Sequence, residues 1–208
     1  MPQQSNHQPA RRLTARGIAT RARIVSAADE LVRVRGVNGM TLDEVTAASG
    51  SSKSQLYHHF ADKESLVHAV IASRGAALLE REEQYLRRTD SLQGLERWRR
   101  AVMQRVTLRN GAFGCMLGSL SSELADQDEI ARLALAQHFA TWEAIIRSAL
   151  ERIQDKGALK PDADPAVLAT ALMAALQGGY LLAQTAHDPE PMRVALDMAF
   201  AHIWSYAS

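Results

Sequence analysis

Residues 40–66 read MTLDEVTAASGSSKSQLYHHFADKESL, and this stretch decides the fold. Thr41 and Glu44 have the spacing of a capping box, which predicts the start of a helix. Gly50 can take the left-handed turn that ends this helix, and the serines that follow can cap a second helix that runs to about Phe60. Two short helices joined by such a turn predict a helix-turn-helix.

The second helix carries hydroxyl groups, a lysine and a Tyr-His-His run, for which we weigh three chemical interpretations. A metal site is disfavoured because His58 and His59 point about 100° apart on a helix, without a Cys, Asp or Glu neighbour at ligand spacing. A serine hydrolase needs a nucleophile on a strained turn and a buried acid, and neither is visible. We therefore expect no catalytic residue, metal ligand or cofactor here.

Phosphate binding is the third interpretation, and it fits the residues. A helix N-terminus offers free N–H groups and the positive end of the helix dipole, while hydroxyl groups, Tyr and Lys add donors and charge. Leu56 and Phe60 share one apolar face, so most polar side chains point away from it. A helix that enters the major groove by its N-terminal end can present Lys53, Ser54 and Gln55 to base edges. The alternative that stays open is an ordinary solvated surface helix.

The whole chain has the composition of a helical protein. Of its 208 residues, 47% are hydrophobic and only 5% are aromatic. Ala, Leu, Arg, Glu and Gln dominate, which favours an all-α fold. The net charge of +1 says little, but basic residues without an acidic neighbour cluster near the start of the chain, which predicts an anionic partner. They are Arg11, Arg12, Arg16, Arg21 and Arg23.

Cysteine usage and the apolar segments bear on location. The single cysteine, Cys115, cannot form an intrachain disulfide and fits a reducing compartment. The first residues lack the apolar core of a secretory signal, so we expect a cytoplasmic protein. Residues 167–186 have the length and apolar composition of a membrane span, but they are rich in Ala and interrupted by Gly178 and Gly179. A buried interface helix is the favoured interpretation.

Helical periodicity divides the chain into three segments. Residues 1–15 form a basic arm, residues 16–61 three helices that include the helix-turn-helix, and residues 62–208 a bundle of about six helices. In this bundle, helices are expected over residues 62–88, from 91 onward, near 115–120, and over 126–157, 165–188 and 191–206. The apolar face of the first helix is expected to contain Ile18, Ala22, Val25, Ala28 and Val32.

Residues 40–66 resemble the DNA-binding signature of the TetR/AcrR family of transcriptional repressors, within a match that covers about residues 16–66. The number and lengths of the remaining helices are similar to those of the family. Ser54 and Gln55 stand where family members often have Gly and a small residue, so no base preference is carried over. The arginine-rich arm is either a further minor-groove or phosphate contact or simply solvated. The resemblance implies phosphate contacts by Thr41, Ser51, Ser52, Tyr57, His58, His59 and Lys63, with Lys53 and Ser54 at base edges.

The resemblance also implies a homodimer, held by a four-helix bundle from the last two helices of each copy. Two DNA-reading heads one helical turn apart require such a partner. Glycines within a helix indicate close backbone approach. The alternative is that both helices only cover the core of one chain. The apolar faces expected at the interface contain Leu172, Leu176, Gly179 and Ala183 on one helix and Met192, Ala195, Ala199 and Ile203 on the other.

A small-molecule effector inside the C-terminal bundle is a further implication of the resemblance. Few charges lie among the candidate lining residues, so we expect a largely apolar or aromatic effector, although most of these residues fit core packing equally well. Cys115 is either a sensor thiol or a buried inert one. The candidates are Trp98, Met103, Phe113, Cys115, Met116, Phe139, Trp142, Met173, Gln177 and Tyr180.

The expected function is that of an effector-responsive repressor that binds double-stranded operator DNA. One alternative is a small helical enzyme that uses the C-terminal cavity, with His138 or His187 as an acid/base group. No pair of titratable groups has catalytic spacing, which disfavours it. The other alternative is a ligand-independent DNA-binding protein, whose C-terminal bundle would be filled.

Overall fold

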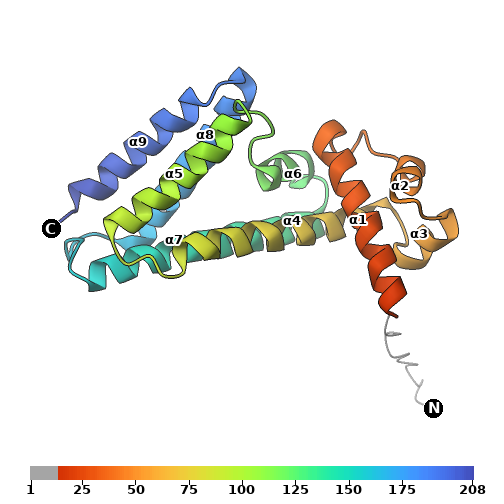
Figure 1. The fold of residues 1–208 in the computed structure, drawn as a ribbon, viewed down its shortest axis with the longest axis horizontal. Helices are drawn as coiled ribbons and strands as arrows, with labels where there is room; N and C mark the ends of the chain where they lie inside the picture. Colours follow the sequence, from red (N-terminus) through yellow and green to blue (C-terminus); the bar gives the residue numbers. More distant parts are fainter. Residues whose placement is uncertain (1–13) are drawn as a thin grey trace, which may run out of the picture. The chain divides into compact units, whose positions relative to one another are not determined.

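The structure is a computed structural model that describes residues 14–208. The predictions for the basic arm, including Arg11 and Arg12, lie outside the described residues. Over residues 14–208 the chain forms nine α-helices and no β-strand, which confirms the all-α fold class (Figure 1). The helices belong to two compact units, one that ends at Val67 and one that runs from His68 to Ser208. We call them the N-terminal and the C-terminal unit.

The N-terminal unit contains the predicted helix-turn-helix. Thr41 and Glu44 form the capping box, and Gly50 ends the helix with a left-handed φ of 64°. Ser52 caps the next helix and forms a second, unpredicted capping box with Gln55. The helices of this unit are α1 (Ala15–Arg35), α2 (Leu42–Ser49) and α3 (Lys53–His59), and α4 (Lys63–Leu86) begins here and continues into the C-terminal unit.

The buried face of α1 agrees with the predicted one only in its second half. Val25, Ala28 and Val32 are buried as predicted, whereas Ile18 is 58% exposed, Ala22 is exposed as well, and Thr20 and Ile24 are buried in their place. Thr20, Ile24 and Ala28 form one row at intervals of four residues along the helix, and α1 packs on α2 and α3. The row begins with a polar residue, Thr20, so hydrophobic periodicity alone did not identify its first turns.

The C-terminal unit consists of the rest of α4 and five further helices. The cap of α7 is Asp128 and not Asp126, where the helix was predicted to begin, because the Asp128 carboxylate accepts a hydrogen bond from the N–H of Ala131 at 2.9 Å. Asp164 caps α8 and Pro165 is its first residue, as predicted. The helices are α5 (Leu92–Leu108), α6 (Met116–Leu124), α7 (Glu129–Asp155), α8 (Pro165–Ala186) and α9 (Glu190–Ser205).

Aromatic side chains and one buried carboxylate organise the core of the C-terminal unit. Trp98 and Phe200 are fully buried, and their rings stack with centroids 6.5 Å apart. The Trp98 indole N–H donates to the fully buried Glu82 at 2.7 Å. Arg81 and Arg105 also donate to this carboxylate, so its charge is paired and its oxygens are satisfied. The Glu82 carboxylate thereby ties α4 to α5.

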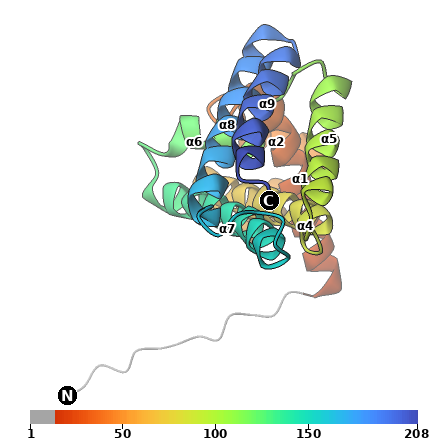
Figure 2. The same cartoon turned by 90° about the vertical axis from the view of Figure 1, so that its left-hand side faces the viewer.

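The helices α8 and α9 lie side by side in both ribbon views (Figure 1 and Figure 2). A Cβ at Gly179 would lie 2.7 Å from the sulfur of Met192, so this glycine lets the two helices of one chain approach each other. The prediction that these inner faces form the dimer interface is wrong, because they already pack within a single chain. The buried residues concerned are Leu172, Leu176, Gly179, Ala183, Met192 and Ile203, while Ala195 and Ala199 are half-buried.

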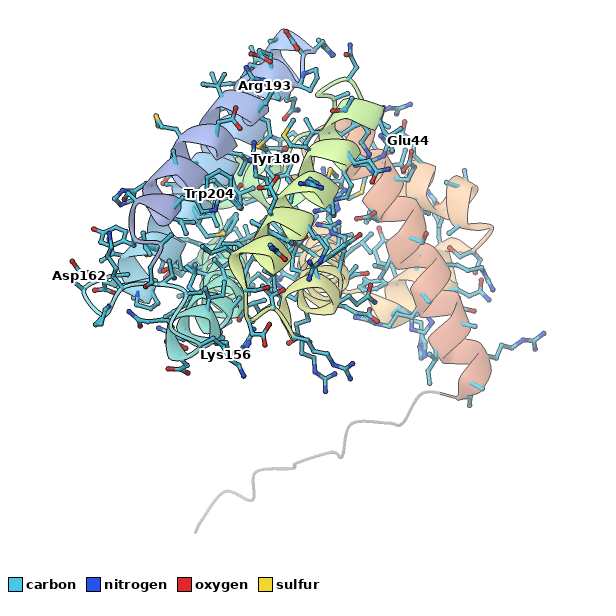
Figure 3. The ribbon with its side chains drawn as sticks, turned by 60° about the vertical axis from the view of Figure 1, so that its left-hand side comes forward. Glu44, Lys156, Asp162, Tyr180, Arg193 and Trp204 are labelled. Atoms are coloured by element: carbon cyan, nitrogen blue, oxygen red, sulfur yellow. The ribbon has the colours of Figure 1, made fainter. Side chains whose placement is uncertain are left out.

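The solvent-facing side of α8 and α9 carries several large apolar side chains. We call it the outer α8–α9 face. Gly178 lies on it in the middle of α8, and nothing lies within 4 Å of the position that its Cβ would take. Trp204, near the end of α9, is 44% exposed and is labelled in Figure 3. By length and composition α8 could cross a membrane, a test that core helices of soluble proteins also pass. The exposed large apolar side chains of the face are Val167, Leu181, Leu182, Val194, Met198 and Trp204.

Candidate functional site

The candidate nucleic-acid surface of the N-terminal unit is built on α3. Leu56 is 1% exposed and Phe60 is 3% exposed, which confirms the buried apolar face predicted for this segment. Tyr57, in contrast, is 56% exposed. The helix therefore turns a polar side to solvent while its apolar side anchors it in the unit. The other exposed side chains of α3 are Lys53, Ser54, Gln55 and His58.

Several residues predicted to contact DNA also cap helices. Ser52 Oγ accepts a hydrogen bond from the N–H of Gln55 at 3.2 Å, and Gln55 Oε1 accepts one from the N–H of Ser52 at 3.0 Å. The Thr41 hydroxyl donates to Glu44 Oε2 at 2.8 Å. This bond and then the Arg35 guanidinium lower the pKa of Glu44, which is labelled in Figure 3. Thr41, Ser52 and Gln55 thus fix where α2 and α3 begin.

Lys53 forms an ion pair with Asp43 of α2. Its Nζ lies 2.8 Å from Asp43 Oδ1, and this hydrogen bond raises the pKa of Lys53. The two side chains are 68% and 73% exposed, so the pair is worth little and opens readily. Asp43 places a carboxylate on this surface. The sequence did not predict this, because only the turn between α2 and α3 brings Asp43 close to Lys53.

Ser51 and Lys63 lie at the two ends of α3. The Ser51 hydroxyl is 2.8 Å from the hydroxyl of Ser49, which ties the start of α3 to the end of α2. Lys63 is the first residue of α4 and is partly exposed. Both predicted phosphate contacts therefore border the helix that carries the exposed tyrosine.

Arg21 of α1 joins the same surface. Its guanidinium lies over the ring of Phe60, 5.0 Å from the centroid. Burial is the largest of the effects that lower the pKa of His59, followed by the neighbouring charges of His58 and Arg21. His59 is therefore biased towards the neutral form, in which it acts as a hydrogen-bond donor without adding charge. The sequence pattern placed Arg21 in a basic cluster but could not show that it packs on Phe60.

The C-terminal unit holds a cavity of about 190 Å³ between α4, α5, α6, α7 and α8. A single water needs only about 10–15 Å³ of such space, so the cavity has room for a small molecule. Four of the predicted lining residues line it, among them Tyr180 of α8, which is labelled in Figure 3. They are Cys115, Met116, Trp142 and Tyr180.

The other predicted lining residues lie elsewhere. Trp98 belongs to the core around Glu82, and Phe113 is 41% exposed with a left-handed φ of 67° in the loop between α5 and α6. An aromatic or methionine at helical spacing marks packing in general, and only the three-dimensional position separates core from cavity. The residues that do not line the cavity are Trp98, Met103, Phe113, Phe139, Met173 and Gln177.

Arginines make the cavity wall far more polar than the sequence predicted. Arg74 and Arg81 reach it from α4, Arg105 from α5, and Arg109 from the residue that caps α5. The predicted lining residues included few charges because none of these arginines was among them. Long side chains of neighbouring helices converge here, which hydrophobic periodicity does not reveal.

Cys115 is a buried free thiol at the start of α6. Burial raises its pKa, and this outweighs the hydrogen bonds from the Gly118 and Leu117 N–H groups, which lower it. A raised pKa leaves less of the reactive thiolate at neutral pH. This favours the interpretation of Cys115 as an inert thiol over that of a sensor.

His138 and His187, which were considered for acid/base catalysis, have roles in packing and in ending a helix. The ring of His138 fills the space beside Gly75, where an added Cβ would come within 2.3 Å of it. Burial lowers the pKa of His138. His187 ends α8 in the left-handed conformation, with a φ of 50°. In the part of the chain that the structure describes, no group of three or more His, Cys, Asp or Glu side chains could hold a metal ion.

Comparison with known proteins matches both units. The family described as "Tetracyclin repressor-like, C-terminal domain" matches residues 91–199, and the family "Bacterial regulatory proteins, tetR family" matches residues 24–70. The chain is 25% identical over 190 residues to the HTH-type transcriptional repressor DhaR of Mycobacterium sp. (strain GP1), covering 86% of this chain and 90% of that protein. It is 29% identical over 189 residues to the HTH-type transcriptional repressor NemR of Escherichia coli (strain K12), covering 88% and 92%.

The fold is also that of a solved structure. A crystal structure of a TetR transcriptional regulator from Chloroflexus aurantiacus superposes with a TM-score of 0.81 at 21% identity. The superposition covers 93% of this chain and 98% of that one. The helical architecture is therefore shared along almost the whole length of both chains.

Proposed function

The chain belongs to the TetR family of transcriptional regulators, and from this premise we propose that it is a homodimeric repressor which a small-molecule effector releases from its operator. The observation that carries the proposal is the division of α3 into two sides. Leu56 is buried in the N-terminal unit, while Tyr57 and the polar side chains around it face solvent. A helix held in this way can enter the major groove with its polar side towards the bases.

The position of a side chain on or near α3 decides whether we assign it to base edges or to phosphates. We assign Lys53, Ser54 and Gln55 to base edges, because they stand in the first turn and are exposed. For Lys53 this requires the opening of its ion pair with Asp43, which costs little because both side chains are exposed to solvent. The proposed phosphate contacts are Thr41, Ser51, Ser52, Tyr57, His58, His59 and Lys63.

Replacement of the two lysines is expected to affect DNA binding in different ways. Lys63→Ala should weaken binding to all sequences and reduce the slope of log affinity against log salt by about one unit, because one phosphate contact is lost. Lys53→Ala should instead relax the preference at one base pair of each half-site by about 1–3 kcal/mol. Affinities measured over a range of salt concentrations on a selected duplex and its single-base variants separate the two effects.

The control is Lys156→Ala, at the exposed end of α7 in the C-terminal unit (Figure 3). It should change neither the slope nor the base preference. An unchanged slope in Lys63→Ala would remove this lysine from the interface, and an unchanged base preference in Lys53→Ala would remove it from base reading.

The outer α8–α9 face is the surface that we assign to dimerisation. Gly178 in a helix interior costs about 1 kcal/mol relative to Ala, and nothing within its own chain requires the missing side chain. A second copy that packs closely against α8 explains both this glycine and the apolar side chains on either side of it. Burial of α8 in such a dimer also fits a cytoplasmic protein rather than one that crosses a membrane.

The effector site that we propose is the cavity of the C-terminal unit. Regulation requires that the effector bind more tightly to a conformation whose two α3 helices no longer fit successive major grooves, because equal affinity for both conformations shifts nothing. The α4 helix belongs to both units: its first turn carries Lys63, and Arg74, Leu78 and Arg81 farther along line the cavity. A tilt of α4 would therefore transmit effector binding to the DNA-binding helices, with a typical coupling of about 1–3 kcal/mol.

A further inference from the structure

The wall of the C-terminal cavity is rich in hydrogen-bond donors and poor in acceptors. Arg81, Arg105 and Arg109 bring guanidinium groups to it, and Tyr180 brings a hydroxyl. Among the described residues that line the cavity none is Asp or Glu. The complementary ligand is therefore one that offers acceptor oxygens and negative charge.

The arginine charges are only partly balanced by the protein. Arg81 Nε lies 2.9 Å from Glu82 Oε1, and an Arg105 amino group lies 3.4 Å from the same oxygen. The second oxygen of Glu82 accepts the indole N–H of Trp98 at 2.7 Å. One carboxylate thus serves two guanidinium groups, and Arg109 adds a third. A negative group in the cavity would offset this excess of positive charge.

An unpaired donor is buried in the same wall. Trp142 is 1% exposed and lines the cavity, and its indole N–H has no hydrogen-bond partner among the residues that the structure describes. A buried donor without a partner destabilises the folded protein, and a ligand oxygen that accepts its hydrogen bond would remove this loss. Burial also raises the pKa of Tyr180 to about 12, so its hydroxyl keeps its proton and remains a donor at neutral pH.

We propose that the effector of this cavity is a small organic carboxylate, whose oxygens bind Arg105 and Arg109 and whose apolar part lies against Leu78 and Val106. The planar guanidinium group binds a carboxylate through two parallel hydrogen bonds, which fixes its orientation as well as its position. The apolar side chains on the remaining wall exclude water from the body of the ligand. The inference rests on the proposed effector role of the cavity and names the chemical class that the cavity selects.

Matched pairs of ligands test the charge directly. Benzoate, phenylacetate and octanoate are each titrated into the full-length protein beside their neutral primary amides, with calorimetry as the measurement. At least one carboxylate should bind, and its amide should bind at least about 10-fold more weakly, since a hydrogen bond to a charged group is worth roughly one to two orders of magnitude in affinity. Amides that bind as well as the carboxylates would overturn the proposal, and so would a complete absence of carboxylate binding.

Matched arginine variants test the place of binding. Arg105→Gln and Arg109→Gln should each raise the Kd of the best carboxylate by about 10- to 100-fold. Arg109 is exposed and caps α5, so the second variant guards against a folding defect caused by the first. Arg100→Gln is the control: this side chain is 76% exposed on the same helix and does not line the cavity, and its replacement should leave the Kd within about 2-fold. Equal Kd values in all three variants would place the carboxylate elsewhere.

Release from DNA is measured in parallel on a duplex selected by the protein from random sequences. If neutral amides release the DNA and carboxylates do not, the repressor function stands and the ligand class is wrong. If carboxylates bind in an arginine-dependent way but never affect DNA binding, the ligand class stands and the effector role of the cavity fails.

Discussion

Met198→Asp is expected to convert the proposed dimer into a monomer and to weaken operator binding by about 100-fold or more. Met198 lies on the outer α8–α9 face and is 72% exposed in the single chain, so the substitution should leave the folded monomer intact. In a two-fold symmetric interface the same substitution occurs twice and buries two unpaired carboxylates. Loss of the partner head removes the gain from simultaneous binding of two half-sites, which reaches about 10²- to 10⁴-fold. Sedimentation velocity and DNA titration measure the two effects.

The control for this variant is Ile130→Asp, which places the same charge on an exposed apolar position of α7. Ile130 is 65% exposed and lies outside α8 and α9. Gly178→Leu offers a second probe, because it raises helix propensity within the chain but blocks close approach from outside. Dimers of normal affinity in both Met198→Asp and Gly178→Leu would place the interface on another surface.

Glu82→Gln is expected to destabilise the C-terminal unit by about 1–3 kcal/mol. The substitution keeps the shape of the side chain but removes the charge that accepts hydrogen bonds from Arg81 and Arg105, and a hydrogen bond to a charged group contributes about this much while the two partly exposed arginines remain solvated. The carboxylate is fully buried, so no solvent replaces it. Thermal or urea-induced unfolding at constant protein concentration measures the difference, with a decrease in Tm of about 2–4 °C per kcal/mol.

Glu83→Gln is the matched control for the buried carboxylate. It changes the neighbouring residue on the exposed side of α4, where the effect should stay within about 0.5 kcal/mol. If Glu82→Gln were as stable as Glu83→Gln, the hydrogen bonds to Glu82 would not hold α4 and α5 together.

Local sequence signals predicted the elements of this protein well. Capping residues such as Thr41 and Asp164 accept hydrogen bonds from the backbone N–H groups directly after them. A few residues of sequence are therefore enough to predict where the helix begins. The turn at Gly50 could also be predicted locally, because the left-handed conformation favours a residue without a Cβ. The helix-turn-helix and the buried Leu56 and Phe60 follow from such local rules.

Properties that depend on several helices were predicted less well. Gly179 and Gly178 are neighbours in sequence, yet one packs against Met192 of its own chain and the other faces open space. Periodicity assigns residues to faces but does not say what covers each face. The same limit applies to the cavity, since Arg81 and Arg105 meet at Glu82 only after α4 and α5 have packed.

Selection of bound duplexes from a random DNA library tests the central claim most directly. The full-length protein is incubated with the library at physiological salt, and the bound sequences are read after several rounds. A homodimer that reads DNA with α3 should enrich a two-fold symmetric motif, with half-sites separated by about 10–10.5 base pairs or a multiple of that spacing. The absence of any enriched sequence, or the enrichment of a single unpaired half-site by the wild-type protein, would contradict a dimeric, operator-specific repressor.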